Sequence, residues 1–136
     1  MDVIFSFLPS SDQVVRLIQQ HRDFGIKTPI MFTLNSGLEH EDIEQLGSKA
    51  VGVLSLDNYV WSLDTAENVA FVDAFEAKYG YKPGSSDQNA YTLTSAILAG
   101  LEANGGNTNI ESLRPAVLSQ VIETPQGTLR WNDNGV

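Results

Sequence analysis

Residues 2–33 read DVIFSFLPSSDQVVRLIQQHRDFGIKTPIMFT, and this stretch decides the fold. Val3 to Leu8 form a continuous apolar run, which is typical of a buried strand in a parallel sheet. Pro9 ends that run, apolar positions with helical spacing follow over residues 12–24, and Gly25 ends the helix. The next apolar run predicts a second strand. A strand, a helix and a strand at this spacing indicate a right-handed parallel crossover.

The same alternation continues for one more unit and then changes. NSGLEHEDIEQLGSKA (residues 35–50) predicts a short helix, and AVGVLSLDNYV (residues 50–60) predicts a third strand. The remainder is mostly helical, with helices expected over residues 66–79, 86–104 and 110–121 and a short strand in QGTLRWNDNGV (residues 126–136). The predicted fold class is therefore α/β: a parallel-sheet, Rossmann-like βαβαβ half followed by a mostly helical portion.

Composition narrows the possible partners. The chain has 136 residues, 42% of them apolar, and a net charge of −9. This charge argues against nucleic acid and anionic membranes as partners. The absence of cysteine excludes disulfides and thiolate chemistry. No apolar run is long enough for a membrane span. The N-terminal residues lack the basic region of a signal peptide, so no signal peptide is expected in this chain.

The tetrapeptide Ser-Ser-Asp-Gln occurs twice, at residues 10–13 and 85–88. Each copy has the pattern of a capping box that opens a helix, with Ser10 paired to Gln13 and Ser85 paired to Gln88. Replacing either capping serine with alanine is expected to cost about 1 kcal/mol of stability. Helix starts that follow strands also bind small polar ligands, so both copies are candidate binding segments as well.

The two histidines give little support for catalysis or metal binding. His21 is predicted on the polar side of the first helix, and His40 lies within an acidic cluster over residues 39–44. Adjacent residues on a helix do not converge on one metal ion, so the acidic cluster is interpreted as a favourable helix N-terminus. We expect no catalytic residues, no metal site and no cofactor.

The aromatic residues divide into two groups. Phe71, Phe75 and Tyr79 have helical spacing and are predicted to lie in the core. Tyr59 and Trp61 stand where the third strand ends, and two interpretations stay open for them. They pack in the core or against the connector, which is the favoured interpretation, or they stack on a ligand.

The order of the elements resembles a known family. Residues 2–33, LGSKAVGVLSLDNY (residues 46–59) and the later segments LDTAENVAFVDAFEAKYGYKP, NAYTLTSAILAGLEANGG and TPQGTLRWNDNG resemble type I periplasmic binding proteins. These are the Leu/Ile/Val-binding family of ABC-transporter receptors. The resemblance extends over nearly the whole chain and implies a C-terminal fragment of a two-lobed protein. It implies that residues 1–58 belong to lobe two, 59–65 to the hinge, and 66–136 to lobe one as helices and a C-terminal strand.

The resemblance also implies a function. Such a receptor binds an amino acid or a related small organic solute without catalysis, in the periplasm or another extracytoplasmic space, and delivers it to a transporter permease. The solute lies between the lobes, at strand ends and helix starts. Carried over by position, the candidate ligand-binding residues are Leu8, Pro9, Ser10, Ser11, Leu34, Asn35, Ser86 and Gln88. After the second strand no carboxylate occurs before Glu39, which speaks against a simple amino acid as the ligand.

Two alternatives remain open at this point. One is a regulatory α/β domain of response-regulator type, although the strand ends carry Pro9, Asn35 and Asn58 and no pair of aspartates. The other is an association fragment that binds no solute. For the receptor fragment, we expect weak or absent solute binding by the chain alone. The apolar helix faces within residues 66–121 predict a homodimer, for which exchange of the C-terminal portion across NYVWSLDT (residues 58–65) is one route.

Overall fold

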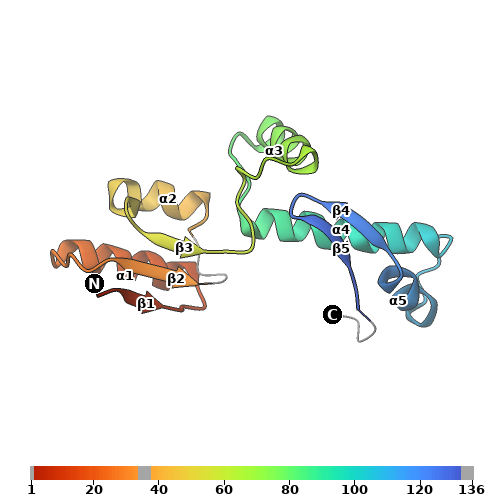
Figure 1. Cartoon of the computed structure of the whole chain (residues 1–136), viewed down its shortest axis with the longest axis horizontal. Coiled ribbons are helices and arrows are strands. Elements are labelled where there is room, and N and C mark those ends of the chain that lie inside the picture. Colours follow the sequence, from red (N-terminus) through yellow and green to blue (C-terminus); the bar gives the residue numbers. More distant parts are fainter. Residues whose placement is uncertain (1, 34–37, 133–136) are drawn as a thin grey trace. The chain divides into compact units, whose positions relative to one another are not determined.

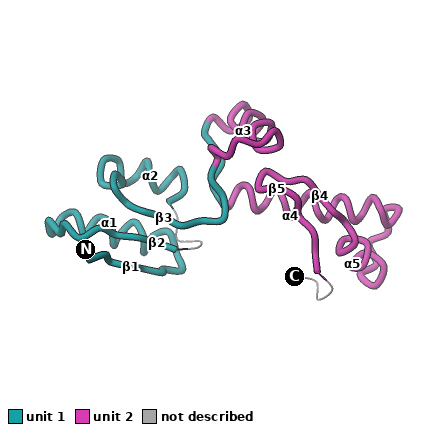
Figure 2. The backbone as a smooth tube through the Cα atoms, in the orientation of Figure 1, with its two compact units in different colours: residues 1–60, 81–85 teal, residues 61–80, 86–136 magenta. Residues whose placement is uncertain are grey.

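A computed structural model describes residues 2–33 and 38–132. The described chain forms two compact units, coloured separately in Figure 2. Unit 1 comprises residues 1–60 together with the short segment 81–85, and unit 2 comprises residues 61–80 and 86–136. Each unit is described by itself below. In the described part of the chain, no helix has both the length and the apolar character that crossing a lipid bilayer requires.

Unit 1 is a parallel three-stranded sheet with helical crossovers (Figure 1). The strands β1 (Ile4–Ser6), β2 (Ile30–Thr33) and β3 (Leu54–Leu56) lie in the order β1-β2-β3, and both strand pairs are parallel. Between them run α1 (Ser11–Asp23), α2 (His40–Leu46) and the 3-10 helix η1 (Gly47–Ala50). The predicted βαβαβ arrangement is confirmed.

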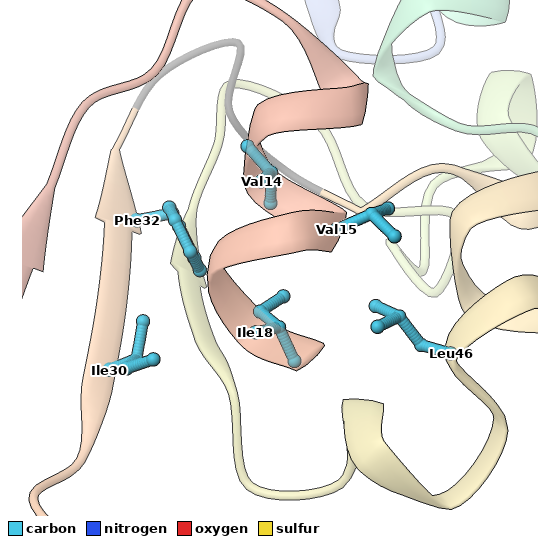
Figure 3. Packing of buried hydrophobic residues seen from close by; sticks show 6 residues of the cluster. All are labelled: Val14, Val15, Ile18, Ile30, Phe32 and Leu46. Atoms are coloured by element: carbon cyan, nitrogen blue, oxygen red, sulfur yellow. The ribbon is translucent and has the colours of Figure 1, made fainter. Parts of the chain in front are cut away.

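The core of unit 1 lies on one face of this sheet. Figure 3 shows its six most buried apolar side chains, which come from α1, β2 and α2: Val14, Val15, Ile18, Ile30, Phe32 and Leu46. Because side chains alternate along a strand, Met31, which lies between Ile30 and Phe32, points to the other face. Its partners in the neighbouring strands, Phe5 and Leu54, point to the same face as Met31. On that face Phe5, Leu54 and Leu56 are exposed, by 63%, 53% and 56%. The covered and the exposed faces are both apolar, as expected for a strand pattern typical of burial on two sides.

The described residues of unit 2 form three helices and a hairpin. The helices are α3 (Ala66–Tyr79), α4 (Ser85–Ala103, whose first residue belongs to unit 1) and α5 (Ile110–Leu118). The strands β4 (Val121–Thr124) and β5 (Gly127–Arg130) pair in antiparallel fashion. The sequence predicted one strand at this end and placed residue 121 in a helix, so β4 is a correction. The Thr124 hydroxyl donates to the Gly127 carbonyl at 2.7 Å and closes the hairpin turn.

The helix caps differ from the predicted capping boxes. Ser10 precedes α1 and its carbonyl accepts from Gln13 and Val14, but its side chain makes no capping hydrogen bond. Ser85 is the first residue inside α4, and the Gln88 amide bonds forward to Thr92 and does not reach back to a cap. Both predicted boxes are therefore wrong.

Side-chain caps occur at three other helix starts. The Thr65 hydroxyl accepts from the Asn68 amide at 3.2 Å, and the Asn109 side chain accepts from the Glu111 amide at 2.9 Å. At α2 the box consists of Glu39 and Asp42, each of whose side chains accepts from the other's backbone amide.

Four side-chain predictions can be compared with burial. His21 is 2% exposed, so its predicted position on the polar side of α1 is wrong. Its Nε2 lies 2.8 Å from the Thr28 carbonyl and its Nδ1 lies 3.3 Å from an Arg22 nitrogen, which satisfies the ring inside the fold. Phe71 is buried as predicted and Phe75 is half-buried, but Tyr79 is 53% exposed and does not belong to the core.

Candidate functional site

The candidate site lies at the carboxyl edge of the unit 1 sheet. Because the three strands are parallel, their C-terminal ends meet at the same edge. The start of α1 follows β1, and the start of α2 follows β2, so both helix starts lie at this edge. In open α/β sheets this edge is where ligands bind.

Four of the predicted ligand-binding residues lie in the turn between β1 and α1 and at the first residue of α1. Leu8 is half-buried and packs against the core, so it supports the turn from below. Pro9, Ser10 and Ser11 are exposed. The Ser11 hydroxyl donates to the Asp42 carboxylate, which joins the start of α1 to the start of α2. The structure thus brings these exposed residues together at the N-terminal end of α1, where backbone N–H groups favour an anionic ligand group.

The start of α2 adds two carboxylates to this edge. The Glu39 amide donates to Asp42 Oδ2 at 3.1 Å, and the Glu39 carboxylate accepts from the Asp42 amide. Asp42 is only 7% exposed and also accepts from Ser11. Sequence reasoning assigned this acidic cluster to the helix N-terminus but missed the role of Asp42. The pair Glu39 and Asp42 has the spacing of a capping box, but glutamate is not among the residues preferred at an N-cap, so the sequence signal is weak.

The remaining predicted residues fall elsewhere. Ser86 and Gln88 belong to the first turns of α4 in unit 2. Ser86 is exposed, whereas Gln88 is completely buried. Gln88 Nε2 donates to the Thr92 hydroxyl at 2.6 Å, and its Oε1 has no hydrogen-bond partner among the described residues. Leu34 and Asn35 lie outside the described residues. Within residues 2–33 and 38–132, no group of His, Asp or Glu side chains could hold a metal ion.

A family comparison identifies the fold. A family model described as "Periplasmic binding protein" matches residues 1–135. The chain belongs to the periplasmic binding protein family. A curated member, the "Leu/Ile/Val-binding protein homolog 6" of Brucella suis, is 28% identical over 128 residues, which cover 91% of this chain and 33% of that protein. This periplasmic binding protein chain therefore spans about a third of the length of the curated relatives it matches.

Solved structures of similar proteins agree with this assignment. A solute-binding protein of an ABC transporter from R. palustris, in complex with 4-hydroxybenzoate, is 28% identical with a TM-score of 0.81, and the match covers 98% of this chain and 38% of that one. A leucine-binding protein from Thermotoga maritima is 20% identical with a TM-score of 0.82, covers 98% of this chain and 38% of that one, and shows the shared fold. The predicted family and fold class are confirmed, and the response-regulator alternative is not supported.

Proposed function

We propose that this chain is part of the solute-binding component of an ABC-type transporter, which binds an amino acid or a related small organic solute without catalysis. One observation carries the proposal: in a chain of this family, the exposed turn of Pro9, Ser10 and Ser11 lies at the carboxyl edge of a parallel sheet, at the start of α1. Hydroxyl groups and a helix start at such an edge suit a small anionic group. The family further supports a permease as partner and a periplasmic or other extracytoplasmic location.

Within this class of solutes, we favour a carboxylate that has no ammonium group. The two carboxylates at the start of α2 are already engaged, because Glu39 caps the helix and Asp42 accepts from both Glu39 and Ser11. Asp42 is also only 7% exposed, so pairing it with an ammonium group would take that group out of water, which costs free energy. The R. palustris relative, whose structure contains 4-hydroxybenzoate, supports the same choice.

The proposed organisation assigns residues 1–58 to one lobe, 59–65 to a hinge and 66–136 to the other lobe. The change of compact unit at Val60 and Trp61 supports a connector in this region. Ser86 would line the solute site from its own lobe. Gln88 is completely buried, so it would support the site from within the fold.

Nuclear magnetic resonance titration of the 136-residue chain tests the proposal. We expect 4-hydroxybenzoate to shift the amide signals of residues 10–12 with a dissociation constant on the order of 1 mM, because a chain that spans about a third of its relatives' length supplies only part of the contacts. Leucine should shift them less. Ser10→Ala should weaken the response, whereas Ser119→Ala, which alters an exposed serine after α5, should not. Submicromolar binding would contradict the expectation that the chain alone binds weakly, whereas no shift of these signals with any carboxylate at about 10 mM would contradict the proposed site at residues 10–12.

A further inference from the structure

Residues 81–85 form a short strap that belongs to a different unit from the helices it joins. The strap connects α3 to α4, yet it groups with unit 1, as its teal colour in Figure 2 shows. Pro83, at its centre, is among the most completely buried side chains of the chain. A loop between two helices is normally exposed, so burial of its central residue indicates a specific seat.

The seat lies at the start of α2 and consists of two contacts. The ring of Tyr81 stacks on the ring of His40, with centroids 4.5 Å apart and planes inclined by only 9°. Gly84 lies against Glu39 so closely that a Cβ atom there would be 1.6 Å from Glu39 Oε2 and 2.7 Å from Glu39 Cδ. A side chain at this position would therefore overlap the carboxylate unless the Glu39 side chain turned away.

The Glu39 side chain cannot move away without losing its hydrogen bond to the start of α2. Its carboxylate accepts from the Asp42 amide and caps α2, and Asp42 in turn accepts from Glu39 and from Ser11. A side chain at residue 84 would have to push the Glu39 carboxylate out of this network and leave the start of α2 uncapped. The strap therefore rests on the same hydrogen bonds that hold the starts of α1 and α2 together.

We propose that the strap and its seat form a latch that fastens the connection between α3 and α4 to the carboxyl edge of the unit 1 sheet. Glu39, His40, Tyr81 and Gly84 are its positioning residues. One ring stack and one close approach are weak enough to open and close by local unfolding. The latch itself is independent of the solute. Its consequence, that closing the latch strengthens solute binding at this edge, rests on the proposed function.

Native-state proteolysis tests the latch without any solute. Chymotrypsin cleaves after Tyr81 only while the strap is released, so the cleavage rate reports the open fraction when closing is fast. We expect His40→Ala to raise the rate of cleavage after Tyr81 roughly three- to tenfold through loss of the stack, and Gly84→Ala to raise it about tenfold or more. Cleavage after Tyr91 within α4 serves as the internal reference and should stay unchanged.

Two further variants make the result specific. Glu44→Gln removes the carboxylate that lies 3.4 Å from His40 Nε2 but leaves the ring stack, so it should leave the rate unchanged. Glu39→Ser in the Gly84→Ala background removes the clash and keeps a capping oxygen, so it should return the rate toward that of the wild type. Equal rates of cleavage after Tyr81 in the wild type, His40→Ala and Gly84→Ala would overturn the latch.

The link to solute binding is tested separately. If the latch strengthens binding, Gly84→Ala should weaken the response of the residue 10–12 amides to 4-hydroxybenzoate about threefold or more, in proportion to the open fraction. An unchanged response in a variant with accelerated cleavage would overturn this link and leave the latch in place. Loss of the response in the wild type as well would refute the proposed function, while the cleavage rates would still decide on the latch.

Discussion

Thr65 and Ser10 both stand directly before a helix with extended backbone angles, and only Thr65 uses its hydroxyl as a cap. The Thr65 hydroxyl accepts from the backbone amide of Asn68. Backbone amides in the first turn of a helix have no partner within the helix, so such a cap satisfies one of them. At α1 the exposed Ser10 side chain makes no capping hydrogen bond, and the neighbouring Ser11 hydroxyl donates to Asp42. The residue type before a helix thus determines whether a capping hydrogen bond is possible, and the orientation of the side chain determines whether that bond forms.

The difference between these two residues gives a stability prediction. Thr65→Ala should lower the free energy of unfolding by about 1 kcal/mol, because the Asn68 amide loses its acceptor. Ser10→Ala should lower it by less than about 0.5 kcal/mol, because an exposed hydroxyl without a capping bond contributes little. Urea denaturation followed by circular dichroism measures both. A larger loss for Ser10→Ala than for Thr65→Ala would show that the two caps have been assigned wrongly.

At the scale of elements, side chains that cross between segments hold the crossovers together. Arg22, in the last turn of α1, donates from Nε to the Lys49 carbonyl at 3.2 Å and from an Nη nitrogen to the Val51 carbonyl at 2.9 Å. These two bonds fix the end of α1 to η1 and to the segment that leads from η1 into β3. Nearby, Lys49 and Asp23 form an exposed ion pair at 2.6 Å.

Arg22 is therefore expected to matter more than the ion pair beside it. Arg22→Met should lower the free energy of unfolding by about 1–2 kcal/mol through loss of two hydrogen bonds from a charged group. Arg22→Lys should recover only part of this, because lysine lacks the planar fork. Asp23→Asn is the matched control and should cost no more than about 0.5 kcal/mol, since exposed ion pairs are weak. Thermal and urea denaturation of the three variants would show the order; equal losses for Arg22→Met and Asp23→Asn would contradict it.

The contact between α4 and α5 predicts whether the substitution Gly100→Ala stabilises or destabilises the chain. A Cβ at Gly100 would be 2.3 Å from Val117 Cγ2 and 2.7 Å from Val117 Cα. Helix propensity alone predicts that Gly100→Ala stabilises the chain by about 1 kcal/mol. Because part of the obstruction is backbone, we expect the clash to win and to destabilise the chain by about 1–3 kcal/mol. Thr94→Ala, at an exposed position of α4, is the control and should be neutral or slightly stabilising.

At the scale of the whole molecule, exposed apolar side chains remain on both units. In unit 1 they lie on the second face of the sheet, at Phe5, Leu54 and Leu56. In unit 2 they lie on α4, where Leu93, Ile97 and Leu98 are exposed by 62%, 55% and 58%. Large apolar patches on a soluble protein commonly mark association surfaces.

We accordingly expect this chain to form a homodimer, as proposed from the sequence. A symmetric pair buries the same surface on both copies and needs no second protein. Light scattering at micromolar concentration should give twice the mass of the chain. Leu93→Lys combined with Ile97→Lys should shift it to the monomer, whereas Phe24→Lys, at an 80% exposed residue next to α1, should not. A wild-type chain that stays monomeric at these concentrations would refute the expectation.

The sequence by itself determined the parallel sheet of unit 1 and most of the helices. Short apolar runs between helical patterns have few alternatives, because a strand of this kind must be buried and a parallel neighbour requires a crossover. It also indicated that Pro9, Ser10 and Ser11 lie at a helix start beside a strand end, which the structure confirms. These features depend on residues close together in the chain.

Only the tertiary structure decided the rest. His21 has a polar side chain that local patterning assigns to the surface, but Thr28 and Arg22 satisfy both of its ring nitrogens and make its burial possible. The strand β4 forms because it pairs with β5, and the strap is held by His40 and Glu39, about forty positions earlier in the chain. Contacts between residues distant in sequence compensate for the cost of burial, and no local pattern records them.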